Sequence, residues 1–104
     1  MYIVHMDLLK FEWDERKSRR NKAKHGVSFE EAQTVFFDEN ALRFFDPDHS
    51  EDEDRFLMLG LSYHLRVLVV CHCFRVSDEV IRLISARKAT VDEEDVYWGR
   101  EEKR

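Results

Sequence analysis

The sequence has 104 residues, of which 43% are apolar and 12% aromatic, and it carries a formal net charge of −5. This length supports one hydrophobic core and this composition excludes a disordered chain, so we expect a single domain over residues 1–104. The longest apolar run, residues 67–71, is far shorter than the roughly 20 residues that cross a bilayer, and the chain does not begin like a signal peptide, so we expect a cytoplasmic protein without membrane association.

The first elements predicted along the chain are a short strand at residues 8–13 and a helix that ends near His25. Asp14 is a good N-cap for this helix, and Gly26 supplies the left-handed residue that ends it. Residues 15–25 contain six Lys or Arg and one acid, whereas residues 46–54 contain six acids and no Lys or Arg. The negative net charge therefore disfavours a nucleic-acid-binding surface all round, but it leaves room for one basic face.

One stripe of this first helix is polar where a packed helix is normally apolar. Following Trp13 at helical spacing, the stripe consists of Lys17, Asn21 and Lys24. It is either a solvated face, whose lysine stems cover apolar neighbours, or a wall against which a polar ligand lies. His25 has two interpretations as well, because a cation offsets the negative end of the helix dipole and an imidazole can transfer protons.

A second helix is predicted from Ser28, with Glu31 three residues later to complete a capping box. An apolar stripe at helical spacing indicates that this helix packs on a sheet. Glu31 is either a capping residue or a catalytic carboxylate, and the capping box favours the former. The residues of the stripe are Phe29, Ala32, Val35 and Phe36.

The rest of the chain has the period-two pattern of an antiparallel meander, followed by one helix. Strands are predicted at residues 42–45, 55–61, 66–74 and 80–87, and a helix at about 91–101 with Thr90 as its N-cap. The predicted fold class is therefore α+β with the order β-α-α-β-β-β-β-α.

Arginines in the predicted strands are the other candidate functional residues. On a regular strand, Arg82 lies on one face, and Ser85 and Arg87 lie on the other. An arginine in an apolar strand needs a partner, which is either an acid on a neighbouring strand or a bound phosphate. Arg55, at the head of its strand, has the same two interpretations.

Two segments that invite a metal site do not fit one. The acidic residues 46–54 lack the oxygen spacing and glycine of an EF-hand loop. Cys71 and Cys73 lie on the face opposite His72, so one cluster cannot use all three, and we expect free thiols. No phosphate-binding loop, dinucleotide fingerprint or hydrolase elbow is present, and we expect neither a cofactor nor a metal.

Several segments, taken together and in order, resemble the BrnT family of type II toxins over roughly residues 9–98. Any one of them is a weak signal, but the ordered set is specific. They are Phe11-Glu12-Trp13-Asp14, Lys17, Asn21, Lys24-His25-Gly26-Val27-Ser28-Phe29-Glu30-Glu31-Ala32, Asp46-Pro47-Asp48-His49-Ser50 and Arg82-Leu83-Ile84-Ser85-Ala86-Arg87-Lys88-Ala89-Thr90.

This resemblance implies a RelE-like fold and a ribonuclease that arrests translation. It also implies neutralisation by a cognate BrnA-like antitoxin with a DNA-binding domain, so that operator DNA is bound only through the antitoxin and this chain meets RNA. The polar residues of the family's segments are Lys17, Asn21, Lys24, His25, Glu31, Arg55, Arg82, Ser85 and Arg87.

The resulting hypothesis is RNA cleavage without a metal, in which cations stabilise the phosphorane and side chains move protons. Arg55, Arg82 and Arg87 would hold the phosphate, and Lys24 or His25 would transfer protons. The substrate-binding residues would be Lys17, Asn21 and Ser85. The alternative is a non-catalytic module whose polar stripe and arginines dock an acidic or antitoxin-like protein.

Overall fold

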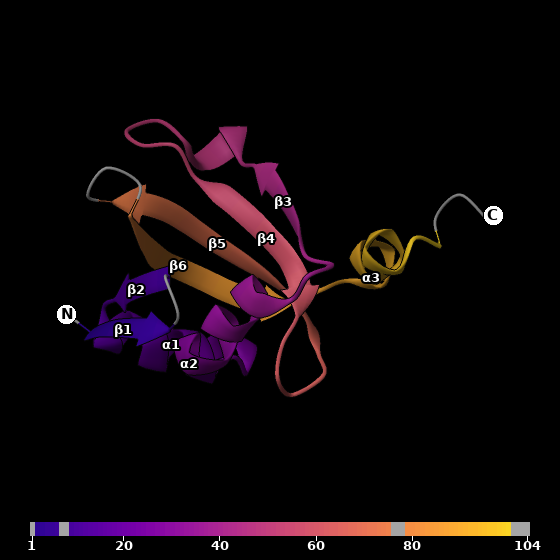
Figure 1. Cartoon of the computed structure of the whole chain (residues 1–104), viewed down its shortest axis with the longest axis horizontal. Helices are drawn as coiled ribbons and strands as arrows, with labels where there is room; N and C mark the ends of the chain where they lie inside the picture. Colours follow the sequence, from indigo (N-terminus) through magenta and orange to yellow (C-terminus); the bar gives the residue numbers. More distant parts are fainter. Residues whose placement is uncertain (1, 7–8, 76–78, 101–104) are drawn as a thin grey trace.

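The computed structural model describes residues 2–6, 9–75 and 79–100, and its main element is a six-stranded sheet (Figure 1). The strand order is β1-β2-β6-β5-β4-β3. The β2 and β6 strands run parallel, and every other neighbouring pair is antiparallel. The strands are β1 (Tyr2–Met6), β2 (Leu9–Trp13), β3 (Leu42–Phe45), β4 (Phe56–Leu61), β5 (Val67–Arg75) and β6 (Val80–Lys88).

One face of the sheet, which we call the helix face, is covered by α1 (Glu15–His25), α2 (Phe29–Ala32) and the 3-10 helix η1 (Gln33–Phe37). Figure 1 shows α1 and α2 close together beside β1 and β2. The main core lies between these helices and the sheet. It contains Phe11, Trp13, Val27, Phe29, Ala32, Val35, Leu68, Val70, Ile81, Leu83 and Ala86. No helix among the described residues is long and apolar enough to span a bilayer.

A second, smaller core lies on the opposite face under α3 (Val91–Trp98). There Val96 and Tyr97 pack against strand residues that include Leu59 and Val69. The Tyr97 hydroxyl donates to Asp38 Oδ2 at 2.6 Å, and the Leu61 backbone N–H donates to the same oxygen at 2.8 Å. Asp38 therefore ties the end of η1 to both β4 and α3.

Most predicted elements are present, with two differences. A strand at Tyr2–Met6 precedes the first predicted one and pairs with β2, so the predicted order lacked an element. The helix predicted from Ser28 is α-helical for only four residues before it tightens into η1. Its apolar stripe still packs as expected, since Phe29, Ala32 and Val35 are fully buried.

A bulge in β6 changes which side chains share a face. Cys71 pairs with Ser85, but the next β5 residue, His72, pairs with Leu83, so Ile84 is an extra residue. Residues directly opposite each other in an antiparallel pair point to the same face. Arg82, Ser85 and Arg87 therefore lie on one face, opposite Cys73, Cys71 and Val69 respectively. The prediction that Arg82 faces away from Ser85 and Arg87 was wrong, because it assumed an unbroken strand.

Candidate functional site

The α1 helix begins and ends at the predicted caps. The Asp14 carboxylate accepts hydrogen bonds from the backbone N–H groups of Arg16 and Lys17, at 2.8 and 3.3 Å. Gly26 has a φ of 73°, and its N–H donates to the Lys22 carbonyl, which ends the helix. The helix is fixed at both ends, and its basic residues project from a rigid element.

Asn21 joins α1 to the sheet. β2 pairs with β6 only at β6 residues 80–82. At Ala86, later in β6, the α1 helix occupies the position of a neighbouring strand. The Asn21 amide donates to the carbonyls of Ala86 and Val27, at 2.8 Å each, and its oxygen accepts from the Ala86 N–H at 3.1 Å. Both amide protons of Asn21 are therefore used within the fold, which gives this side chain a structural role.

A shallow pocket of about 240 Å³ lies where α1 meets the bulged part of β6. Lysine, arginine and histidine side chains line it, and none of its lining residues within the described part of the chain is an acid. The pocket brings together five residues of the sequence hypothesis, namely the polar stripe, His25 and Ser85. The lining residues are Lys17, Arg20, Asn21, Lys24, His25, Ile84 and Ser85. We call this the α1 pocket.

The strand arginines lie on the face opposite α1 and not in the α1 pocket. Arg82, Ser85 and Arg87 share this face because of the bulge. Arg55 precedes β4 and lies close enough to the Cys71 thiol to affect its pKa. We call the set Arg55, Arg82, Ser85 and Arg87 the arginine face. Ser85 belongs to both groups, since it lines the α1 pocket and pairs with Cys71.

Each of these arginines has an acidic neighbour. The Arg82 Nη1 lies 2.8 Å from Glu12 Oε2 on the adjacent β2, so the ion-pair interpretation is confirmed for Arg82. Arg87 binds Glu93 through two hydrogen bonds of 2.7 and 2.9 Å, which raises the pKa of Arg87 and lowers that of Glu93 to about 2.

Arg55 is held more loosely than the other two arginines. It lies 4.0 Å from Glu53, and its buried Nε has no hydrogen-bond partner within the described part of the chain. Phosphate binding by Arg82 or Arg87 would therefore require exchange of an existing acid partner. Arg55 has the weakest ion pair to give up.

The thiols between these arginines are free and protonated. Burial raises the pKa of Cys71, and burial with the neighbouring Glu53 raises the pKa of Cys73 to about 11. His72 lies on the face opposite the thiols, as predicted; it is fully buried among aromatic rings of the helix face, and burial lowers its pKa to about 4. Neither thiol is a thiolate nucleophile near neutral pH.

Glu31 does not complete the predicted capping box. Ser28 Oγ accepts from the Glu31 N–H at 3.1 Å, but the carboxylate turns inward, where it accepts from Ser62 Oγ at 2.7 Å and from the Arg66 guanidinium. Glu31 is 2% exposed. Burial raises its pKa, but the hydrogen bonds from Arg66 and Ser62 outweigh burial and lower it overall. The capping box was wrong because a guanidinium is a stronger partner for a buried carboxylate than a backbone N–H.

Arg66 also binds the end of α1. Its Nη2 donates to the Gly26 carbonyl at 3.0 Å, directly after His25. The buried Glu31–Arg66 pair therefore positions the end of α1 that borders the α1 pocket. This makes Glu31 a positioning residue for the site.

Sequence reasoning missed an Asp–His pair in the acidic segment. His49 Nδ1 lies 2.9 Å from Asp46 Oδ2, and the backbone of Asp46 pairs with that of Arg55. Ser50 closes the turn, since its hydroxyl donates to the Asp46 carbonyl at 2.5 Å and accepts from the Arg55 N–H at 2.9 Å. The three-residue spacing of Asp46 and His49 was the available signal, but the segment was considered only as a metal site.

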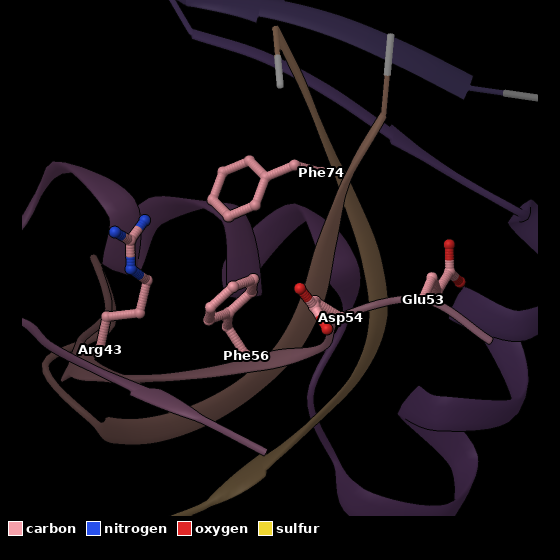
Figure 2. A pocket seen from close by; sticks show the side chains of 5 residues that line it. All are labelled: Arg43, Glu53, Asp54, Phe56 and Phe74. Carbon is pink, nitrogen blue, oxygen red and sulfur yellow. The ribbon is translucent and has the colours of Figure 1, made fainter. Parts of the chain in front are cut away.

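The second missed feature is a larger pocket, of about 570 Å³, beside β3, β4 and β5 (Figure 2). Arg43 lies 5.5 Å from the ring centroids of both Phe56 and Phe74, and these two rings are 5.5 Å apart. The remaining lining residues are Glu53 and Asp54. We call this the aromatic pocket.

Comparison with known proteins places this geometry in a family. Residues 13–93 match the family described as "Ribonuclease toxin, BrnT, of type II toxin-antitoxin system". The chain belongs to the BrnT family. The solved structures include the BrnT ribonuclease toxin of Brucella abortus, which is 29% identical with a TM-score of 0.56, over 75% of this chain and 92% of that chain. A comparison with curated proteins gives no match.

The BrnT match covers the elements that build the candidate surfaces. Its span runs from the last residue of β2 to Glu93, which binds Arg87. It therefore includes the α1 pocket, the arginine face and the aromatic pocket, and leaves β1 outside. The family is that of ribonuclease toxins, whose type II systems pair a toxin with an antitoxin.

Proposed function

We propose that this BrnT protein is a metal-independent endoribonuclease of RelE-like fold that inhibits translation in the cytoplasm. A BrnA-like antitoxin with a DNA-binding domain neutralises it, and operator DNA is bound only through that antitoxin. One observation carries the catalytic part of the proposal. On a chain with a net charge of −5, the α1 pocket gathers Lys17, Lys24 and His25 beside Ser85 with no acid in its lining.

The α1 pocket supplies the groups that RNA cleavage needs. A base removes the 2′-hydroxyl proton, the 2′-oxygen attacks phosphorus, and an acid protonates the departing 5′-oxygen, which leaves a 2′,3′-cyclic phosphate. His25 is half-buried at the end of α1 and performs proton transfer, with Lys24 beside it. Lys17 and Ser85 bind the substrate from the two sides of the pocket.

The arginine face extends this site along the RNA. Ser85 connects the α1 pocket to it, and Arg87 follows two residues later on the same face. Arg55, Arg82 and Arg87 contact the phosphates by exchanging their carboxylate partners for phosphate oxygens. The weak ion pair of Arg55 makes it the first to exchange.

The test is incubation of purified, antitoxin-free protein with RNA in the presence of a chelator. We expect fragments that end in 2′,3′-cyclic phosphate. His25→Ala should lower the rate about 10²- to 10⁴-fold, and Lys24→Ala about 10²-fold, because they remove proton transfer and a charge beside the phosphate. Intact RNA with the parent protein would favour the non-catalytic docking module.

Arg19→Ala is the matched control. Arg19 lies on the same helix and has the same charge as Lys24, but it lines a different pocket, together with Arg16 and Arg20. We expect it to weaken RNA binding slightly and to leave the rate at saturating RNA unchanged. If Arg19→Ala and His25→Ala reduced that rate equally, α1 would be a general electrostatic surface and the α1 pocket would not be the catalytic site.

A further inference from the structure

The aromatic pocket combines ring faces, a cation and carboxylates in an arrangement that the proposed cleavage site does not use. Phe45 and Phe56 form an edge-to-face pair with centroids 5.8 Å apart, and Phe56 makes a second such pair with Phe74. Phe45 is 51% exposed, which is unusual for so large an apolar side chain. Arg43 lies over two of these rings. Aromatic and guanidinium surfaces on a sheet are the groups on which unpaired nucleobases stack.

The carboxylates determine which part of an RNA this pocket can take. Glu53 and Asp54 line it, and carboxylates that line a pocket repel the phosphate oxygens of a ligand bound in it. In Figure 2, Phe56 lies between Arg43 and Asp54, so a ring stacked on this platform has a cation at one end and an acceptor at the other. A planar, uncharged group with N–H donors on its edge fits these contacts.

Asp54 is the carboxylate available to a ligand. It is exposed, and it has no hydrogen bond or ion pair with the described part of the chain. Glu53 is shared instead between Arg55 and Arg75, at 4.0 and 3.9 Å. An ionised carboxylate only accepts hydrogen bonds, and its two oxygens match two parallel N–H groups.

From this geometry we infer that the aromatic pocket is a nucleobase subsite that prefers guanine. Guanine offers a carboxylate two adjacent donors, N1–H and the N2 amino group. Adenine and cytosine offer one amino group, and uracil has a single N–H flanked by two carbonyl oxygens that a carboxylate repels. The inference rests on the proposed RNA substrate and adds base selectivity to it, in the order guanine, then adenine and cytosine, then uracil.

A direct binding measurement tests this without cleavage. The side-chain Nε–Hε resonance of Arg43 is followed by NMR while guanosine, inosine, adenosine or uridine 5′-monophosphate is added to the full chain. We expect saturable shifts with guanosine, weaker binding of inosine, which lacks the 2-amino group, and the weakest binding with uridine. Equal shifts with all four would overturn the base preference.

Asp54→Asn is the decisive variant, because Asp54 has no hydrogen bond or ion pair within the described residues that the substitution would break. It should lower guanosine monophosphate affinity about tenfold and remove the preference over inosine, since an amide presents only one acceptor oxygen. Arg43→Ala lacks the reporting resonance, so its affinity is measured by calorimetric titration, and it should fall for every base by about 5- to 100-fold, which is the range for one stacking contact. Asp52→Asn is the matched control, since Asp52 is exposed in the same segment but lines a different pocket.

The outcomes separate this inference from the proposed function. If the parent protein cleaves RNA but guanosine monophosphate does not shift Arg43, the subsite is wrong and the nuclease proposal stands. If guanosine monophosphate binds as expected and RNA stays intact, the subsite stands and the nuclease proposal falls. Protection of Arg43 by a purified antitoxin, without any nucleotide effect, would make the aromatic pocket a protein-docking surface and overturn the inference.

Discussion

Asn21 on α1 and Ala86 on β6 are joined by two hydrogen bonds in the pattern that neighbouring strands use. The side-chain amide donates to the Ala86 carbonyl at 2.8 Å and accepts from the Ala86 N–H at 3.1 Å. The edge of β6 is thus closed by a helix side chain, and the same residue holds the Val27 carbonyl after the helix ends. The position of the α1 pocket depends on this contact.

Replacing Asn21 should therefore destabilise the fold. Asn21→Ala leaves the buried N–H and carbonyl of Ala86 without partners, and we expect a loss of about 3 kcal/mol in the free energy of unfolding. Asn21→Asp should be at least as damaging, because a carboxylate cannot donate to the two carbonyls. Urea titration followed by circular dichroism measures both. Lys17→Ala, an exposed neighbour on the same stripe, should change stability by less than about 0.5 kcal/mol. Equal stability of the Asn21 variants and the parent would contradict this role.

The buried Glu31–Arg66 pair predicts that removing Arg66 alone costs more stability than removing both charges. Arg66→Met leaves an uncompensated carboxylate that is 2% exposed, and we expect a loss of about 3–5 kcal/mol in the free energy of unfolding. Adding Glu31→Gln to Arg66→Met should recover much of this loss, because the charge is gone. A double-mutant cycle by urea unfolding measures the coupling. Independent, additive effects would show that the two side chains do not act as a pair.

The buried His72 predicts a pH dependence of stability. Burial lowers its pKa to about 4 in the fold from an ordinary 6.5, so the unfolded chain takes up a proton at a higher pH than the folded chain. The contribution is fully present above pH 6.5 and is lost as the pH falls towards 4, with a total on the order of 3 kcal/mol. Unfolding free energies from pH 7.5 to 4 measure it, and His72→Phe should flatten the slope. An unchanged slope in that variant would place the titrating group elsewhere.

Gly60 is needed for the close approach of η1 to β4. A Cβ at this position would lie 3.0 Å from the Cβ of Ala41 and 3.2 Å from that of Val35. Both neighbours are short side chains that cannot move aside, so we expect Gly60→Ala to cost about 1–3 kcal/mol of unfolding free energy. Thermal unfolding measures it. Adding Ala41→Gly to Gly60→Ala removes the nearest clashing Cβ and should recover part of the loss. A Gly60→Ala variant more stable than the parent would show that the contact has room.

The sequence predicted the elements whose signals are local. Asp14 and Gly26 fixed the ends of α1, and Thr90 is the predicted N-cap of α3, where Glu93 completes a capping box. Period-two patterns located four strands to within a residue at each end. These features depend on neighbours a few residues away, which are visible in a sequence.

Features that depend on distant neighbours were missed. Glu31 was assigned to a capping box because its partner Arg66 lies 35 residues away, although both occur in the sequence. The bulge at Ile84 depends on how β5 and β6 pair and has no composition signal. The aromatic pocket combines Arg43 with Phe56 and Phe74, which only the strand order brings together. The assignment of Lys24, His25 and the arginines to RNA chemistry stays a prediction.

The extra residue in β6, Ile84, determines to which face of the sheet the side chains after it point. The strand before Ile84 and the strand after it are each regular, but their alternation is offset by one position. If Ile84 were paired regularly instead of forming a bulge, the second half of β6 would turn over, so that Arg87 would point into the helix core and Ala86 to the outside. Deleting Ile84 would instead remove the bulge and leave Ser85, Ala86 and Arg87 on their present faces. The bulge at Ile84 thus decides whether three polar side chains can serve the same substrate.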